Sequence, residues 1–201
     1  MSIPRLVDSF REVSSQIVTP QNPTSTLILP SDAFGHPTWI PGTIGKSTRI
    51  LTTTGGFTVE IGRQIQISGL FITGVGNSTV SLEYNYVANG GSSVNLDFLE
   101  ISLTTVQRNN VRNITMTLVD INDKSVSVTK AVDLGGSFNW NTGEFFGLEP
   151  TAIKSLKLSI LVVNNDPNMT QLFLSLIGSN SPSGGGTGFI VNGILENTCG
   201  Y

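Results

Sequence analysis

The residue types best suited to catalysis are scarce and far apart in this chain. His36 is the single histidine and Cys199 the single cysteine among 201 residues. A Ser-His-Asp arrangement would depend on His36, and no G-x-S-x-G motif accompanies it. A zinc site needs three or four His, Cys or carboxylate ligands, and the first two types are almost absent. We therefore expect no catalytic residues and a protein that is not an enzyme.

Carboxylates are the remaining candidates for a catalytic acid or base. Glycoside hydrolysis needs two carboxyl groups about 5–10 Å apart. The sequence leaves such a pair open among Glu83, Glu100, Glu144 and Glu149. Most carboxylates of a β-sandwich are solvated, and we favour that interpretation. The turn Asp120-Ile-Asn-Asp123 has calcium-type ligands, but a solvated hairpin turn explains it equally well.

Aromatic side chains beside amides make a better case for a ligand. Trp39 stands near His36, and Trp140 stands between Asn139 and Asn141. Exposed aromatic faces flanked by amides suit the binding of sugars. The alternative is that both tryptophans are partly buried and anchor loops to the core. We keep these five as the candidate ligand-binding residues.

Composition narrows the class of partner. Charged residues make up 12% of the chain, against about 25% in ordinary globular domains. The eleven Lys and Arg residues are scattered, so the basic stripe that nucleic-acid binding needs is missing. The apolar stretches are far shorter than the ~20 residues that span a bilayer, and residues 1–10 lack the pattern of a signal peptide. We expect no nucleic acid, no membrane span, and a place outside the cell or on a particle surface.

The strongest pattern along the chain is the alternation of apolar and polar residues. Alternation sends one set of side chains into a core and the other toward solvent. It occurs in residues 57–61, 63–67, 80–86, 114–118, 125–129 and 155–160, with Gly, Asn and Pro between the runs. The pattern predicts an all-β fold, a two-sheet antiparallel β-sandwich of jelly-roll type. We expect about eight to ten strands and little helix.

The whole chain, residues 1–201, reads as one domain. Residues 1–18 form an N-terminal extension or edge element, in which a short amphipathic helix and an irregular strand are both open. Residues 19–48 are expected to be a Pro-rich loop and residues 179–188 a Gly/Ser-rich hinge. Residues 189–201 are expected to supply the last strand and a tail.

The cysteine of this tail has two interpretations. Cys199 is either an incidental thiol or a candidate for an intermolecular cross-link, because a lone cysteine near a terminus can reach a neighbouring molecule.

The order of these runs resembles the galactose-binding-like jelly roll, the fold of many carbohydrate-binding modules. The resemblance is carried by Leu6-Val-Asp-Ser-Phe10, Gly42-Thr-Ile-Gly-Lys-Ser-Thr-Arg49, the strand Ile114 to Asp120, Phe138, Trp140 and the strand Ile153 to Ile160. It implies a sandwich whose loops or concave face bind a ligand.

The resemblance also raises the question of a metal, because many members hold structural calcium near the first and last strands. Asp8 matches one such carboxylate, whereas the last strand offers only Asn192 and Glu196. We expect no cofactor and leave calcium open at Asp8, Asp120 and Asp123.

Two functions remain. Low surface charge, Thr-rich strands, extended termini and a tail cysteine favour a non-catalytic structural subunit that self-assembles on an exterior surface, as in a fibre, coat or shell. Its partners would be copies of itself, held by strand addition from residues 6–18 or 189–195 to an unprotected edge. The alternative is a carbohydrate-binding module that binds a glycan through the loop aromatics.

Overall fold

Strands make up most of the regular structure. The computed structural model describes residues 5–8, 16–29, 46–64, 67–96, 98–105, 111–131, 138–164 and 172–179. The strands in these ranges are β1 (Arg5–Asp8), β2 (Gln16–Val18), β3 (Thr24–Leu29), β4 (Ser47–Thr54), β5 (Thr58–Gln64), β6 (Ile67–Thr73), β7 (Gly76–Asn85), β8 (Phe98–Thr105), β9 (Val111–Asp120), β10 (Ser125–Ala131), β11 (Phe138–Asn141), β12 (Ile153–Asn164) and β13 (Leu172–Ser179). Two short 3-10 turns, η1 (Ala88–Gly90) and η3 (Thr142–Glu144), join them. The predicted all-β class is confirmed.

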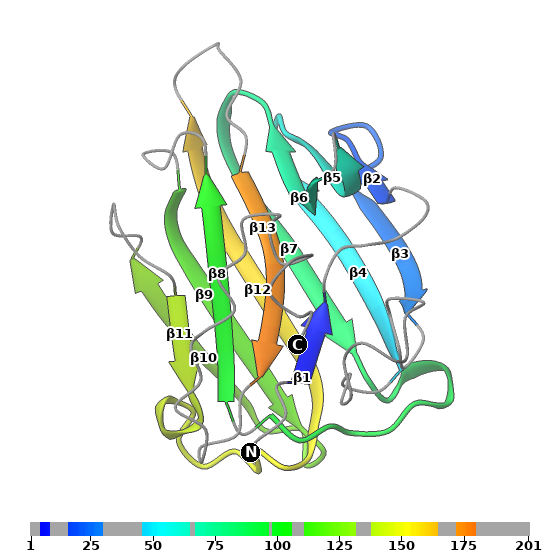
Figure 1. Cartoon of the computed structure of the whole chain (residues 1–201), viewed down its shortest axis with the longest axis vertical. Coiled ribbons are helices and arrows are strands. Elements are labelled where there is room, and N and C mark those ends of the chain that lie inside the picture. The colour runs from blue at the N-terminus through cyan, green and yellow to red at the C-terminus, as the bar shows by residue number, and fades with distance from the viewer. Residues whose placement is uncertain are drawn as a thin grey trace, which may run out of the picture.

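The strands form two antiparallel sheets, which lie one in front of the other in Figure 1. Sheet A has the order β11-β8-β13-β6-β5-β2, with β1 also paired to β13, and sheet B has the order β10-β9-β12-β7-β4-β3. Within them, β6-β13-β8-β11 faces β7-β12-β9-β10, so that successive strands cross repeatedly between the sheets. This is the order of an eight-stranded jelly roll, which β5 and β2 extend beyond β6 in sheet A and β4 and β3 extend beyond β7 in sheet B.

The N-terminal segment is built into sheet A. Residues 5–8 pair with the end of β13 at Ile177–Ser179, next to the place where β6 pairs with Leu172–Leu174. Residues 16–18 pair with β5. For the described part of residues 1–18, the strand alternative is therefore confirmed. In the structure, β1 pairs with β13 and β2 pairs with β5 of the same chain, rather than adding to a sheet of a neighbouring molecule.

The predicted loop over residues 19–48 was wrong in part, because it contains β3. Residues 24–29 pair in an unbroken register with β4, which itself begins at Ser47. Pro23 and Pro30 bracket this run but leave its interior free of proline, so its backbone can join a sheet. The short strands β1, β2, β3 and β11 raise the described total to thirteen, above the number expected from long alternating runs.

Several predicted features lie outside the described residues. These are the hinge beyond Ser179, the last strand and tail at 189–201, and residues 30–45 of the Pro-rich segment. Within the described residues, Gly55-Gly56 forms the turn that carries the chain from β4 to β5. Gly55 has φ +97°, and a Cβ there would lie 2.4 Å from the Asn77 carbonyl oxygen, so this turn accepts only glycine without a shift of the backbone.

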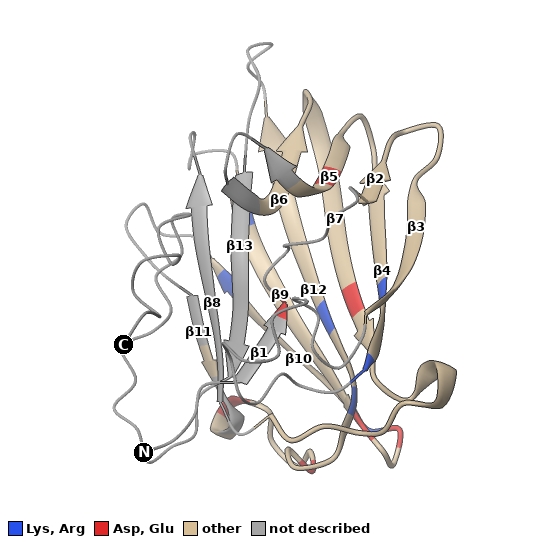
Figure 2. Cartoon of the chain, turned by 45° about the vertical axis from the view of Figure 1, so that its right-hand side comes forward, with Lys and Arg blue, Asp and Glu red and all other residues tan. Residues whose placement is uncertain are grey.

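The core lies between the sheets and follows from the alternation. On β12, Leu156, Leu158, Ile160 and Val162 are fully buried, while the residues between them are partly exposed. β7 and β9 show the same pattern. Charged residues occupy only short stretches of the described strands (Figure 2). In the part of the chain that the structure describes, we find no helix long and apolar enough to cross a membrane.

Candidate functional site

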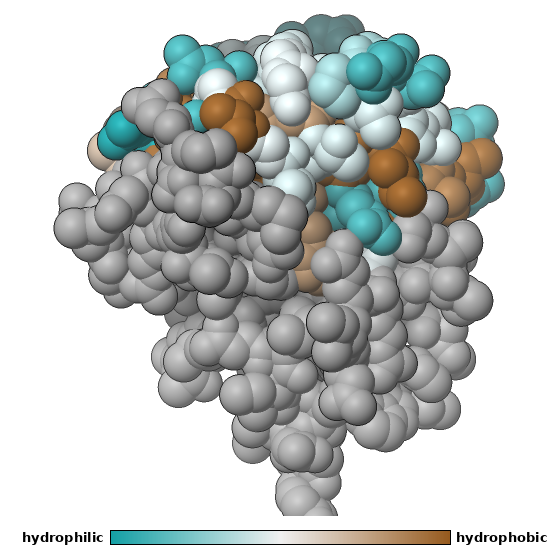
Figure 3. All heavy atoms as spheres, turned by 90° about the horizontal axis from the view of Figure 1, so that it is seen from above, coloured by the Kyte–Doolittle hydropathy of each residue, from teal (hydrophilic) through white to brown (hydrophobic). Residues whose placement is uncertain are grey.

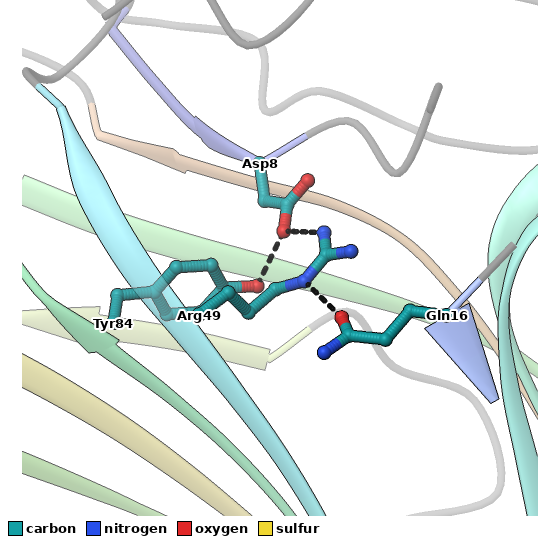
Figure 4. Close-up of polar contacts among 4 residues, drawn as sticks. All are labelled: Asp8, Gln16, Arg49 and Tyr84. Carbon is teal, nitrogen blue, oxygen red and sulfur yellow. Dashed lines mark hydrogen bonds and ion pairs between the residues drawn. The ribbon is translucent and has the colours of Figure 1, made fainter. Parts of the chain in front are cut away.

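A buried polar cluster links the two sheets (Figure 4). Asp8 and Gln16 reach inward from β1 and β2 of sheet A, and Arg49 and Tyr84 from β4 and β7 of sheet B. One oxygen of the Asp8 carboxylate, Oδ2, accepts hydrogen bonds from Arg49 Nη1 at 2.6 Å and from the Tyr84 hydroxyl at 2.7 Å. Arg49 Nε donates to Gln16 Oε1 at 3.0 Å. Arg49 and Tyr84 are 0% exposed, so the cluster is closed to solvent.

The electrostatics of this cluster suit a structural contact between the two sheets. Burial raises the pKa of Tyr84 well above its usual range, and the Asp8 carboxylate raises it further. Burial also raises the pKa of Tyr86, again with a contribution from Asp8. Both phenols therefore stay neutral over the physiological range. These hydrogen bonds join β1 and β2 of sheet A to β4 and β7 of sheet B through the core.

Two residues singled out by the family resemblance meet in this cluster. Asp8 belongs to the first motif of that resemblance and Arg49 ends the second. Asp8 was also a candidate calcium ligand, and its carboxylate is paired with the Arg49 guanidinium.

The other calcium candidates serve the β9–β10 hairpin. Asp120 Oδ1 accepts the backbone N–H of Asn122 at 2.8 Å and of Lys124 at 3.0 Å, and Oδ2 accepts that of Glu149 at 3.3 Å. Asp123 forms an ion pair with Lys154. Within the described ranges, no three His, Cys, Asp or Glu residues are grouped so that they could hold a metal ion.

Trp140 anchors an edge of the sandwich. Its side chain is 1% exposed, and Nε1 donates to the Val128 carbonyl of β10 at 3.2 Å. The Lys130 ammonium lies 5.3 Å from the centroid of the ring and pairs with Glu144. A ring buried in this way has no face open to a sugar. Trp140 therefore fits the anchoring alternative, and its burial removes it from the candidate ligand-binding residues.

Of the remaining candidate residues, the structure gives the strand positions of two and does not describe the other three. Asn139 and Asn141 flank Trp140 on β11, opposite Glu100 and Phe98 of β8. His36, Trp39 and Cys199 lie outside the described residues.

The outer face of sheet B carries a row of hydroxyl groups that crosses every strand. The strand registers place these residues side by side in the order Thr129, Thr115, Ser159, Ser81, Thr52 and Thr24. Thr115 and Thr129 share a hydrogen bond of 2.8 Å, and Ser81 and Ser159 one of 3.3 Å. With strands about 4.8 Å apart, the row is about 24 Å long. We call it the hydroxyl row.

The neighbouring row adds charge at one place only. It runs through Ser127, Thr117, Lys157, Glu83, Ile50 and Thr26. Lys157 and Glu83 are direct cross-strand neighbours, so opposite charges stand side by side in the middle of the face. The hydroxyl row and this row together form a polar surface of low net charge.

The end of the sandwich offers a different surface. Seen from above, hydrophobic residues of the described part form separate spots among hydrophilic ones (Figure 3). The exposed large hydrophobic residues of the described ranges are Ile17, Ile28, Val75, Val87, Ile121 and Phe146. Each of these six residues comes from a different strand or connection, and we therefore take the outer face of sheet B as the stronger candidate surface.

The sequence pattern did not predict the hydroxyl row, although it carries part of the signal. Thr or Ser occupies outward positions in the alternating runs at 80–86, 114–118, 125–129 and 155–160. Alternation shows which residues share a face of one strand. It does not show which strands are neighbours or how they are aligned, so the row emerges only from the pairing of six strands.

Comparison with known proteins gives similarity to solved structures only. No protein-family model matches the sequence, and no curated protein matches it. A family 11 carbohydrate-binding module of the cellulosomal cellulase Lic26A-Cel5E of Clostridium thermocellum is 11% identical, with a TM-score of 0.39 over 89% of this chain and 95% of the module. TmCBM61, solved in complex with β-1,4-galactotriose, is 4% identical, with a TM-score of 0.35 over 85% of this chain and 91% of that chain.

PfGH50B is 12% identical, with a TM-score of 0.40 over 66% of this chain. The match spans 22% of the length of PfGH50B. Carbohydrate-binding modules of the β-sandwich type are thus among the structures similar to this chain, as the sequence resemblance predicted.

Proposed function

We propose that this protein is a non-catalytic module that binds a neutral glycan on the outer face of sheet B. The observation that carries the proposal is the hydroxyl row, in which six hydroxyl side chains from six strands stand next to one another. A hydroxyl group both donates and accepts hydrogen bonds, as the hydroxyl groups of a sugar do. A row about 24 Å long suits an extended oligosaccharide.

Charge supports a neutral ligand. The middle of the face holds one Lys157–Glu83 neighbour pair, so an acidic glycan would meet little net attraction there. The chain as a whole has a formal net charge of −3. We place such a module outside the cell or on a particle surface, where glycans are found.

The absence of a catalytic role belongs to the same proposal. Glu144 pairs with Lys130, and Glu83 stands on the outer face next to Lys157 rather than in a described pair of carboxylates. Tyr84 and Tyr86, the described phenols, are buried and held neutral. The chemistry of the described residues is that of hydrogen bonding and packing.

Calorimetric titration with neutral and acidic oligosaccharides, β-1,4-galactotriose among them, tests the proposal. The triple variant Thr115→Val, Ser159→Ala, Ser81→Ala removes three hydroxyls from the middle of the row with little change in shape. Each lost hydrogen bond is worth about 0.5–1.5 kcal/mol, so the affinity should fall at least about tenfold. Thr58→Val, an exposed hydroxyl on β5 of sheet A, is the matched control and should bind normally.

Two outcomes would contradict this assignment. If no neutral oligosaccharide binds the wild-type protein, the proposed function fails. If the triple variant binds normally while Trp39→Ala abolishes binding, the glycan site lies at the loop aromatic instead of the hydroxyl row.

A second candidate is the self-assembling structural subunit. It is favoured by one observation, the uncharged edge strand β3, whose sequence from 24 to 29 is Thr-Ser-Thr-Leu-Ile-Leu. Self-association at β3 and glycan binding meet at Thr24, which is the β3 end of the hydroxyl row.

A further inference from the structure

The two edges of sheet B are built differently. At the β10 edge, the Val128 carbonyl accepts the indole N–H of Trp140 at 3.2 Å. Lys130 of the same strand lies over the ring of Trp140 and pairs with Glu144. A hydrogen-bonded edge carbonyl and a lysine are both features that hinder the addition of a further strand. The β10 edge is therefore protected.

The β3 edge has neither feature. None of its six residues is charged or proline, and its register with β4 contains no bulge. The side chains of Thr24, Thr26 and Ile28 are exposed, Ile28 by 53%. A regular, uncharged edge strand is a ready template for pairing with another strand.

The hydrogen bonds of β3 show which of its backbone groups point away from sheet B. The Thr53 N–H donates to the Pro23 carbonyl at 2.9 Å, so this opposed pair is a hydrogen-bonded one. In an antiparallel ladder such pairs alternate with pairs that are not hydrogen-bonded. Ser25, Leu27 and Leu29 thus bond to β4. The N–H and C=O groups of residues 24, 26 and 28 are directed toward the edge.

We propose that β3 pairs antiparallel with β3 of a second copy of this chain, about a two-fold axis at Thr26. Thr26 then faces Thr26 of the second copy, and Thr24 faces its Ile28. In each of these pairs the two residues exchange both N–H···O bonds, because their backbone groups, which pair with no second described strand, point at each other. The result is one continuous sheet made of the two B sheets.

A second copy of this chain is the partner that pairs with β3, because β3 is complementary to itself. It has no charge that would repel its own copy, and a Thr–Thr pair directly across strands is favourable. A dimer held by six residues a side buries less than the roughly 1,000 Å² of a stable interface, so the association is weak and depends on concentration. The proposal goes beyond glycan binding and does not depend on it.

Light scattering over a range of concentrations tests the dimer. The mass of the wild-type protein should rise from 21.4 kDa toward about twice that value as the concentration increases. Thr26→Lys places two positive charges opposite each other at the two-fold axis and should keep the protein monomeric. Thr129→Lys is the matched control: it puts the same charge on the same face at the protected β10 edge, and its mass should rise as in the wild type.

A second variant tests the backbone directly. Thr26→Pro removes the edge-facing N–H without removing a bond to β4, and it should also remain monomeric. Circular dichroism of each variant reports whether the sandwich is intact. A wild-type mass of 21.4 kDa at every concentration would overturn the proposal. So would association that Thr26→Lys and Thr129→Lys affect equally.

Discussion

The Asp8 carboxylate lies 2.6 Å from the Arg49 guanidinium, and the two side chains come from opposite sheets. Both side chains are buried, that of Asp8 at 2% exposure and that of Arg49 at 0%. Asp8 sits on a four-residue strand, so a short N-terminal element contributes the counter-charge for the core of the sandwich.

Asp8→Ala should destabilise the protein by about 3–5 kcal/mol, because it leaves a buried guanidinium without its carboxylate. Urea unfolding followed by circular dichroism measures this loss. The double variant Asp8→Leu, Arg49→Met replaces the pair with apolar side chains of similar volume and should lose less than the single variant. A loss below about 1 kcal/mol in Asp8→Ala would contradict the structural role given to this pair.

The buried phenols predict instability at alkaline pH. Tyr84 and Tyr86 have pKa values raised by burial, whereas in the unfolded chain tyrosine titrates near pH 10. The stability that these two neutral, buried phenols contribute is therefore fully present below about pH 10. Above it, only the unfolded state releases protons, so the free energy of unfolding falls by about 1.4 kcal/mol per pH unit for each tyrosine.

Urea unfolding between pH 9 and about pH 11 measures this slope. Tyr84→Phe should lower the slope by about half, since one of the two buried phenols is removed. The same slope in both proteins would show that the loss arises elsewhere.

Asp120 predicts a different dependence in acid. Burial acts to raise its pKa, but the backbone N–H groups of Glu149, Lys124 and Asn122 bring it below the usual range. The contribution of the ionised group to stability is thus present above the unfolded value, near pH 3.9, and is lost as the pH falls through the folded value.

Asp120→Asn removes this titration and keeps an acceptor for the hairpin N–H groups. Its thermal unfolding midpoint should be lower than that of the wild type at neutral pH, and the gap should close as the pH is lowered below about 4. A gap of constant size across the pH range would contradict the role of the ionised carboxylate.

Trp140→Phe separates anchoring from ligand binding. The change removes the hydrogen bond to the Val128 carbonyl and part of the attraction to Lys130, and we expect a loss of about 1–3 kcal/mol. Glycan affinity should not change, because the ring is buried. Denaturant unfolding and calorimetric titration of the same sample measure both quantities. A stable variant that no longer binds glycan would return Trp140 to the ligand-binding residues.

Local pattern predicted much of the fold. The alternation at 80–86, 114–118 and 155–160 anticipated β7, β9 and β12, because one buried face demands apolar residues at every second position. The same rule was less useful for β3 and β1. These strands are short, and an edge strand or a strand of four residues gives too few alternations to be distinguished from a loop.

The sequence by itself determined the class of the protein: an all-β chain with little charge, one histidine and one cysteine, built from alternating strands. Only the tertiary structure decided which distant residues meet. The Asp8–Arg49 pair and the hydroxyl row depend on strands brought together from far apart in the chain, and on the register with which they align. Strand pairing is non-local, so the spacing of residues along one strand carries no record of the neighbour that lies beside it.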